Sequence, residues 1–249
     1  MKVTPTINIV AIVQARMGST RLPGKALLEI AGMPMLFRVL NRLARSKLIA
    51  EIVVATTKSV ADDELVKACD ERGVESFRGS ENDVLDRYFE AARKYNADVV
   101  VRITSDCPLI DSLIVDQVID KYMQNHESVD YVSNVLEPRT FPRGLDIEVF
   151  SNLALARAWE EDSNSQFREH VTQYFLRNPD KFRLMGIFND IDLSYMRWTV
   201  DTPEDLEFVR TVYDQFENDL FTWIELVTLL KRKPELLTIN QHVKQKHIY

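Results

Sequence analysis

Three short, almost continuous apolar runs constrain this chain more than any other feature of its sequence. They are residues 7–14 (INIVAIVQ), 51–56 (EIVVAT) and 98–104 (DVVVRIT). Such runs are typical of strands that are buried on both faces of a parallel sheet. Helical patterns lie between and after them, over residues 35–46, 61–72, 82–95 and 112–124. This alternation predicts an α/β fold of three layers, with a mostly parallel, twisted sheet between two layers of helices.

The second half of the chain carries weaker patterns. They predict strands at 129–134, 146–151, 182–188 and 197–200, and helices at 152–161 and 166–178. We therefore expect an inserted β-region over residues 130–190. Thr202 and Pro203 are the residue types preferred as the N-cap and first residue of a further helix. We expect one domain over residues 1–220 and a helical tail over 221–249.

Composition excludes several classes of protein. The chain has 249 residues and a net charge of −7, which argues against a protein that coats nucleic acid or an anionic membrane. Its two cysteines form neither a disulfide framework nor a metal motif, as expected of a protein in the reducing cytoplasm. Neither a membrane-spanning run nor a signal-peptide pattern is present in the sequence.

A basic loop follows the first apolar run. The segment 14–25 (QARMGSTRLPGK) contains Arg16, Arg21 and Lys25 and has no acidic residue. Glycine lets backbone amides approach phosphate oxygens, and the basic side chains neutralise them, so the loop predicts a polyphosphate site. It lacks both the GxxxxGK[ST] and the GxGxxG pattern. The alternative is a solvated basic turn built on the Pro-Gly pair at 23–24.

Two aspartates follow predicted strands. Asp106 comes after the third apolar run in TSDCPLID, and Asp201 ends the run RWTVD. Taken alone, each aspartate is typical of the turn that precedes a helix. After Asp106, the N-cap of that helix would be Asp111 or Ser112. Because ligands bind at the carboxyl ends of the strands in open α/β sheets, the pair predicts a Mg²⁺ site facing a triphosphate. Asp205 is expected on the exposed surface of a helix's first turn.

Four separated motifs resemble one enzyme family. The loop RMGSTRLPGK resembles the N-terminal signature of the cytidylyltransferases that activate sugar acids, in particular the SpsF branch. The motifs around Asp106, over 137–150 (EPRTFPRGLDIEVF) and around Asp201 extend the resemblance over residues 7–210. It implies a nucleotidyltransferase fold of the nucleotide-diphospho-sugar transferase type. The implied reaction transfers CMP from CTP to a sugar acid and releases pyrophosphate. The enzymes resembled are usually homodimers.

The resemblance also assigns the nucleotide and metal sites. It implies Arg16, Lys25, Asp106 and Asp201 as catalytic residues, with Asp106 and Asp201 as Mg²⁺ ligands. The implied nucleotide-binding residues are Ala15, Arg16, Gly18, Ser19, Arg21, Lys25, Arg78, Ser80 and Asp106. The stretch that contains Arg78 and Ser80 would face the base and ribose. The alternative is an ordinary helix start there, with Ser80 or Asn82 as the N-cap.

The acceptor would be small and anionic. Arg139 or Arg143 could hold its carboxylate bidentately, and Asp146 or Glu148, which share a face of the predicted strand, could bind hydroxyls. The alternative for the strand that carries Asp146 and Glu148 is a solvated face. His170, in REHVT on a predicted helix, is a further candidate contact, and its alternative is a structural role.

Other functions remain open from the sequence alone. The same chemistry could act on a non-sugar acceptor such as a phosphonate or polyol phosphate. A glycosyltransferase would use the NDID segment at 189–192, and a non-catalytic binding protein would keep only the loop.

Overall fold

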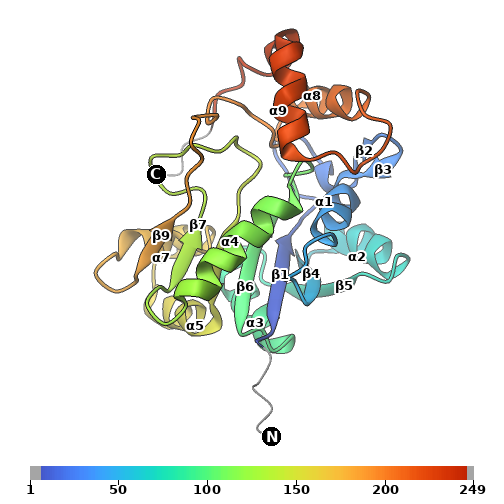
Figure 1. Cartoon of the computed structure of the whole chain (residues 1–249). Helices are drawn as coiled ribbons and strands as arrows, with labels where there is room; N and C mark the ends of the chain where they lie inside the picture. The colour runs from blue at the N-terminus through green and yellow to red at the C-terminus, as the bar shows by residue number, and fades with distance from the viewer. Residues whose placement is uncertain (1–6, 246–249) are drawn as a thin grey trace, which may run out of the picture.

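The computed structural model describes residues 7–245. A seven-stranded sheet runs through the centre in the order β5-β4-β1-β6-β8-β7-β9 (Figure 1). The strands are β1 (Ile9–Gln14), β4 (Glu51–Thr57), β5 (Glu75–Gly79), β6 (Val99–Thr104), β7 (Tyr131–Ser133), β8 (Glu148–Ser151) and β9 (Leu184–Gly186). Only β8 within this sheet runs antiparallel to its two neighbours, so the predicted mostly parallel sheet is confirmed.

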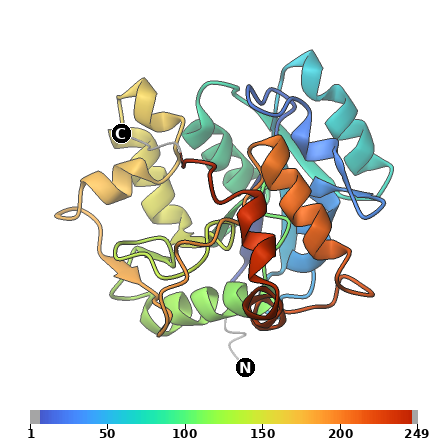
Figure 2. The same ribbon diagram turned by 90° about the horizontal axis from the view of Figure 1, so that it is seen from above.

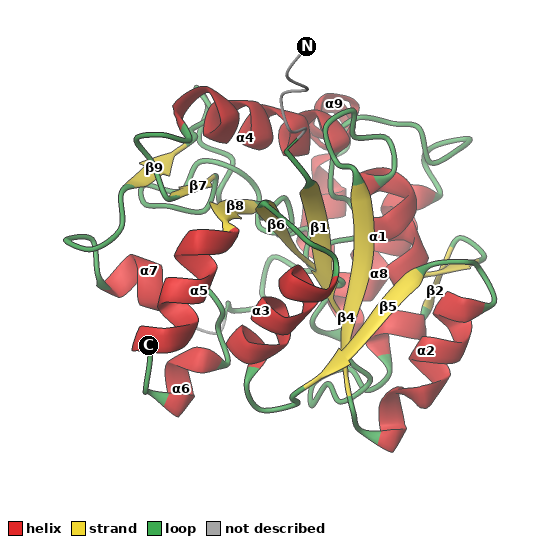
Figure 3. Ribbon diagram, turned by 90° about the horizontal axis from the view of Figure 1, so that it is seen from below, coloured by secondary structure: helices red, strands yellow, loops and turns green. Residues whose placement is uncertain are grey.

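Helices cover both faces of the sheet (Figure 3). One layer contains α1 (Met35–Leu43), α2 (Asp63–Asp70), α4 (Ser112–Asn125), α8 (Pro203–Tyr213) and α9 (Trp223–Arg232). The other contains α3 (Val84–Lys94), α5 (Asn152–Glu161), α6 (Ser165–Arg168) and α7 (Gln173–Arg177). Along β1, Ala11 and Val13 pack into the first core, and Val10 and Ile12 into the second. This alternation explains why β1 reads as a continuous apolar run, and it confirms the three-layer fold.

Several predicted boundaries are wrong. The helix expected over 166–178 is two short helices, α6 and α7, separated by a turn at 169–172. The strand expected over 197–200 is an extended segment with one isolated bridge, between Arg197 and Arg143. Strand β8 begins at Glu148, so Asp146 lies in the loop before it. A small hairpin of β2 (Glu29–Ile30) and β3 (Met33–Pro34) carries too little pattern to predict.

The inserted region extends the central sheet. β8 pairs with β6, β7 pairs with β8, and β9 pairs with β7, while α5, α6 and α7 cover one face. This region therefore shares the core of the first half of the chain. None of the helices within residues 7–245 is long and apolar enough to cross a membrane.

The C-terminal part also packs on this core. Phe221, Leu226 and Leu230 are buried in the same cluster as β1 and α1. After α9, the 3-10 helix η3 (Pro234–Ile239) leads into a segment that runs across the carboxyl ends of the strands toward α5–α7 (Figure 2). The described part of the predicted tail, residues 221–245, thus contributes to the core and lies above the edge where ligands are expected. Residues 246–249 of the predicted tail lie outside the described residues.

Candidate active site

One lysine joins the two predicted aspartates. Lys25 opens the 3-10 helix η1 (Lys25–Leu27), directly after Gly24, whose φ of 67° suits a residue without a side chain. Its Nζ donates hydrogen bonds to Asp106 Oδ2 at 2.8 Å, Asp201 Oδ1 at 2.9 Å and the Val200 carbonyl at 2.8 Å. The structure therefore brings Lys25, Asp106 and Asp201 together at one point, at the carboxyl end of β6.

The charges of this cluster stabilise one another. Burial lowers the pKa of Lys25, but the two carboxylates raise it more, so it lies above the usual 10.5. Burial raises the pKa of Asp106, but the ammonium of Lys25 and the hydroxyl of Thr104 lower it more, to below 3.8. Lys25 and Asp106 are therefore both ionised at neutral pH. Two carboxylates that converge on a single cationic atom form a site able to hold a divalent cation beside phosphate oxygens.

An extended segment places Asp201 beside Asp106. The Val200 amide donates to the Asp106 carbonyl at 2.8 Å, and the Trp198 amide donates to the Arg143 carbonyl. Gly144 has a φ of +103°, and a Cβ added there would lie 2.5 Å from the backbone nitrogen of Thr199. The glycine therefore permits the loop that carries Arg143 to lie directly against the segment that carries Asp201.

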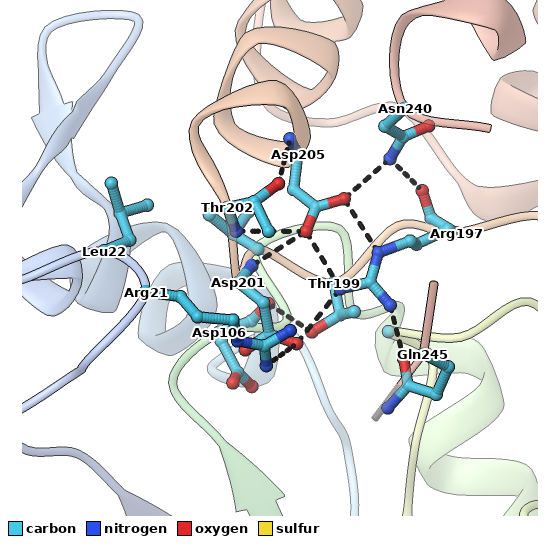
Figure 4. Close-up of polar contacts among 12 residues, drawn as sticks. Arg21, Leu22, Asp106, Arg197, Thr199, Asp201, Thr202, Asp205, Asn240 and Gln245 are labelled. Atoms are coloured by element: carbon cyan, nitrogen blue, oxygen red, sulfur yellow. Dashed lines mark hydrogen bonds and ion pairs between the residues drawn. The ribbon is translucent and has the colours of Figure 1, made fainter. Parts of the chain in front are cut away.

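Asp205 is part of this network, so its predicted place on the helix surface is wrong. Its carboxylate is fully buried and pairs with Arg197 through two bonds of 2.8 and 2.9 Å (Figure 4). It also accepts the amides of Asp201 and Thr202, and the Thr202 side chain caps α8 in return. Arg197 extends to Asp201 Oδ2 at 3.1 Å. The spacing of Thr202 and Asp205 is that of a capping box, the signal that could have placed Asp205 correctly.

The basic loop is held at its start. The buried carboxylate of Asp62 accepts the Met17 amide at 2.7 Å, together with the hydroxyls of Thr56 and Thr57. Further along, Arg21 lies 3.0 Å from Asp201 Oδ2, whereas Arg16 is half-exposed and lies 4.0 Å from Glu169. Of the other predicted loop residues, Ala15 donates to the Ala55 carbonyl and Ser19 to the Met17 carbonyl. A Cβ added at Gly18 would meet no atom within 4 Å.

Arg78 and Ser80 have structural contacts in this structure. The Arg78 guanidinium binds the Thr57 and Ser59 carbonyls and the Asp63 carboxylate at 2.6–2.9 Å. Ser80 accepts the Asp83 amide at 3.1 Å. The N-cap of α3 is Asp83, which accepts the Asp86 amide, so the expectation of Ser80 or Asn82 is wrong. By contrast, Asp111 caps α4 as expected.

Arg87 is a residue of this region that sequence reasoning missed. It is 2% exposed, donates to the Ser80 carbonyl at 3.0 Å, and its Nε has no partner among residues 7–245. Burial lowers its pKa, and the neighbouring charge of Arg16 lowers it further. A Cβ at Gly79 would lie 2.7 Å from Arg87 Cγ. The available signal was an arginine on the apolar face of the predicted helix.

The predicted acceptor residues have different surroundings. Arg139 pairs with Asp146, so both are engaged. Glu148 is buried, pairs with Arg102 and accepts the Tyr131 hydroxyl at 2.6 Å, so the expected shared face of Asp146 and Glu148 is wrong.

Arg143, by contrast, has no hydrogen bond or ion pair from its guanidinium to any residue in 7–245. His170 lies in the turn between α6 and α7 and not on a helix.

The segment 189–192 shows only turn contacts. Asp192 accepts the Ser194 amide at 2.8 Å, and Asn189 donates to the Ile191 carbonyl at 2.7 Å. Within the described part of the chain, no group of three or more potential metal-binding side chains is present, here or elsewhere.

The chain is similar in sequence to characterised families. Residues 10–249 match the family model described as cytidylyltransferase. The chain is 32% identical over 239 residues to the spore coat polysaccharide biosynthesis protein SpsF of Bacillus subtilis, covering 93% of this chain and 97% of that protein. It is 40% identical over 121 residues to a 3-deoxy-manno-octulosonate cytidylyltransferase of Geobacter sulfurreducens, covering 48% of this chain and 47% of that enzyme.

Solved structures agree with these similarities. A cytidylyltransferase of Leptospira borgpetersenii superposes with a TM-score of 0.90 at 37% identity, covering 97% of this chain and 100% of that one. A CMP:2-keto-3-deoxy-manno-octonic acid synthetase complexed with CTP superposes with a TM-score of 0.67 at 22% identity, covering 84% and 99% of the two chains, and shares the fold. The chain therefore belongs to the cytidylyltransferase family, as an SpsF-type, CTP-dependent nucleotidyltransferase.

Proposed function

We propose that this enzyme transfers CMP from CTP to a sugar acid, in the synthesis of a surface polysaccharide or glycan. The convergence of Lys25 with Asp106 and Asp201, beside a loop that adds Arg16 and Arg21, is the observation that carries this proposal. These five charged groups match what nucleotidyl transfer requires at a triphosphate. The relatives named above support the sugar-acid class of acceptor.

In the proposed reaction, a hydroxyl oxygen of the acceptor attacks the α-phosphorus of CTP. A new phosphorus–oxygen bond forms, the bond from the α-phosphorus to the bridging oxygen breaks, pyrophosphate leaves, and the hydroxyl proton passes to water. Arg16, Arg21 and Lys25 neutralise the charge that builds up on the leaving β- and γ-phosphates. Because Arg21 and Lys25 contact Asp201 in the structure, they would move toward the triphosphate when it binds.

Asp106 and Asp201 would hold Mg²⁺ in this proposal. The donor set fits, because both carboxylates have an oxygen within 3 Å of one cationic atom and hard oxygen ligands suit this ion. Bound there, Mg²⁺ would supply Lewis-acid polarisation of the phosphate. Since Lys25 occupies the point of convergence, it would leave the carboxylates when the ion enters.

Arg143 is our candidate for the acceptor carboxylate. Arg139 is engaged by Asp146, whereas the guanidinium of Arg143 has no partner among residues 7–245 and its backbone is fixed by Met196 and Trp198. Arginine can hold a carboxylate with two parallel hydrogen bonds.

Nucleotide selectivity tests the proposal. With Mg²⁺ present, CTP should raise the melting temperature of the protein more than UTP, GTP or ATP, because a ligand that binds only the folded state stabilises it. An equal or larger shift with UTP or GTP would remove the cytidylyl assignment.

A further inference from the structure

A cavity of about 440 Å³ with both polar and apolar lining lies beside the site, between the C-terminal segment and the loops that carry Arg143 and Arg197. Its volume falls in the range of small-molecule sites, about 300–1,000 Å³. Its lining includes Arg143, Tyr195, Arg197, Asn240, Gln241 and Gln245. Three of these residues, Asn240, Gln241 and Gln245, come from the chain after η3, which has no role in the proposed reaction.

The inner end of the cavity adjoins the two-carboxylate cluster. One nitrogen of Arg197 binds Asp201 Oδ2 at 3.1 Å, and the other terminal nitrogen binds the side-chain carbonyl of Gln245 (Figure 4). Asn240, which is 2% exposed, donates to the Arg197 carbonyl at 2.9 Å and to Asp205 at 3.0 Å. A molecule in the cavity is therefore separated from Asp201 by a single side chain.

The positive charge of Arg143 in the cavity lining favours binding of an anion. The positive charge of Arg197 is balanced by Asp201 and Asp205 at contact distance, but Arg143 has no such partner in the described chain. Burial and the neighbouring Arg139 lower the pKa of Arg143 more than the nearby carboxylate of Asp146 raises it. One guanidinium is therefore available to a carboxylate.

Several other polar groups of the lining suit hydroxyl groups, beside apolar side chains that include Leu237 and Val243. The Asn240 amide group already donates to the Arg197 carbonyl and to Asp205, so Asn240 fixes the position of the C-terminal segment. Gln241 is exposed, and the side-chain nitrogen of Gln245 has no hydrogen-bond partner among residues 7–245. The Tyr195 side chain is 68% exposed at the same cavity. Amide and phenol groups can both donate to and accept from hydroxyls.

We propose that the C-terminal segment 240–245 forms one wall of the acceptor pocket, where Gln241 and Gln245 bind hydroxyls of a polyhydroxylated carboxylic acid whose carboxylate pairs with Arg143. This inference rests on the proposed function and adds a determinant of acceptor specificity outside the inserted region.

Substitution of Gln245 separates a binding role from a structural one. Gln245→Glu keeps an oxygen acceptor for Arg197, so a purely structural contact would be preserved or strengthened. In a carboxylate-binding pocket, however, the added negative charge should raise the acceptor KM about tenfold or more. Gln241→Ala and Gln245→Ala should each raise it severalfold. The KM for CTP should change less than about twofold.

Steady-state pyrophosphate release, with CTP and 2-keto-3-deoxy sugar acids of different chain lengths varied in turn, measures these constants. Gln124→Ala, an exposed glutamine on α4, is the matched control and should behave as wild type. An unchanged acceptor KM in Gln245→Glu would overturn the proposal, and a defect confined to CTP would reassign the cavity to the triphosphate.

Direct binding keeps this test separate from the proposed function. Calorimetric titration of the same sugar acids, with and without CTP, should show weaker binding to Gln245→Glu than to wild type even where no turnover is seen. If CTP binds and the wild-type chain binds none of these acids, the pocket proposal is wrong. If CTP itself neither binds nor stabilises the wild-type chain, the proposed function fails independently.

Discussion

The ammonium nitrogen of Lys25 lies 2.8 Å from a carboxylate oxygen of Asp106, although 81 residues separate them in the chain. The same nitrogen contacts Asp201, a further 95 residues along. The loop after β1, the end of β6 and the extended segment before α8 therefore meet at one cation. This arrangement places an ion pair where the proposed chemistry needs a metal ion, so in the proposal Lys25 and Mg²⁺ would compete for the same carboxylate oxygens.

Removing the lysine tests this competition. Lys25→Met should reduce pyrophosphate release by about 10²–10³-fold, the usual effect of losing one preorganised charge. In the nucleotide-free protein, however, Mg²⁺ should raise the melting temperature of Lys25→Met more than that of wild type, because the carboxylates are then uncompensated. A Mg²⁺ response no larger than that of wild type would show that Asp106 and Asp201 do not share a metal site.

Removing Asp205 should destabilise the protein. Asp205→Ala leaves the buried guanidinium of Arg197 with one carboxylate fewer and removes the side-chain acceptor for the Thr202 amide in the capping box of α8. The free energy of unfolding should therefore fall by about 3–5 kcal/mol. Glu207→Ala, an exposed acid on the same helix, should change it by less than about 0.5 kcal/mol. Urea unfolding measures both values. Equal effects of the two substitutions would place Asp205 outside any stabilising network.

The pH dependence of stability tests the anchor of the basic loop. Burial raises the pKa of Asp62, but the Met17 amide and the threonine hydroxyls lower it more, to below its usual 3.8. A carboxyl with a depressed folded pKa contributes stability that is present above the unfolded pKa and is lost as pH falls through the folded one. The difference in unfolding free energy between wild type and Asp62→Asn should therefore be constant near neutrality and shrink below about pH 4. A difference that grows toward low pH contradicts this.

Arg143 should control the acceptor and not the nucleotide. Arg143→Ala should cost about 2–3 kcal/mol of acceptor binding, which is tens- to over a hundred-fold in apparent affinity, with little change for CTP. Arg143→Lys should rescue only part of it, because an ammonium cannot form the planar double hydrogen bond. Kinetics with each substrate varied separately give the answer. A defect mainly in CTP binding would assign Arg143 to the triphosphate.

The strands and helices of the first half of the chain were predictable because the hydrophobic pattern within each segment shows how it is buried. Apolar runs such as β1 need no partner to be recognised, and Asp106 follows the run that forms β6. The acids were harder to place. The alternation of Glu148 with apolar residues predicts a side chain that faces the acceptor or solvent, but Arg102 is its register partner on β6 and pairs with it inside the protein. Pairing across strands leaves no local pattern.

The extended segment before Asp201 shows the same limit. Residues 197–200 have the composition of a strand, yet Gly144 lets another loop approach them so closely that they bond to Arg143 and Asp106 instead of joining the sheet. The contacts of the chain after α9 with the site could not be predicted either, because Gln245 binds Arg197 from 48 residues further along the chain. Such contacts depend on the folded path of the chain and not on spacing.

Product analysis tests the central claim most directly. Wild-type protein, CTP, Mg²⁺ and a 2-keto-3-deoxy sugar acid should give a CMP-linked sugar acid and pyrophosphate in equal amounts, followed by phosphorus NMR. Asp106→Asn and Asp201→Asn should remain folded by circular dichroism and form both products at least about a hundredfold more slowly. Formation of both products at the wild-type rate by either variant, or no pyrophosphate from the wild-type chain with any such acid, would contradict the account.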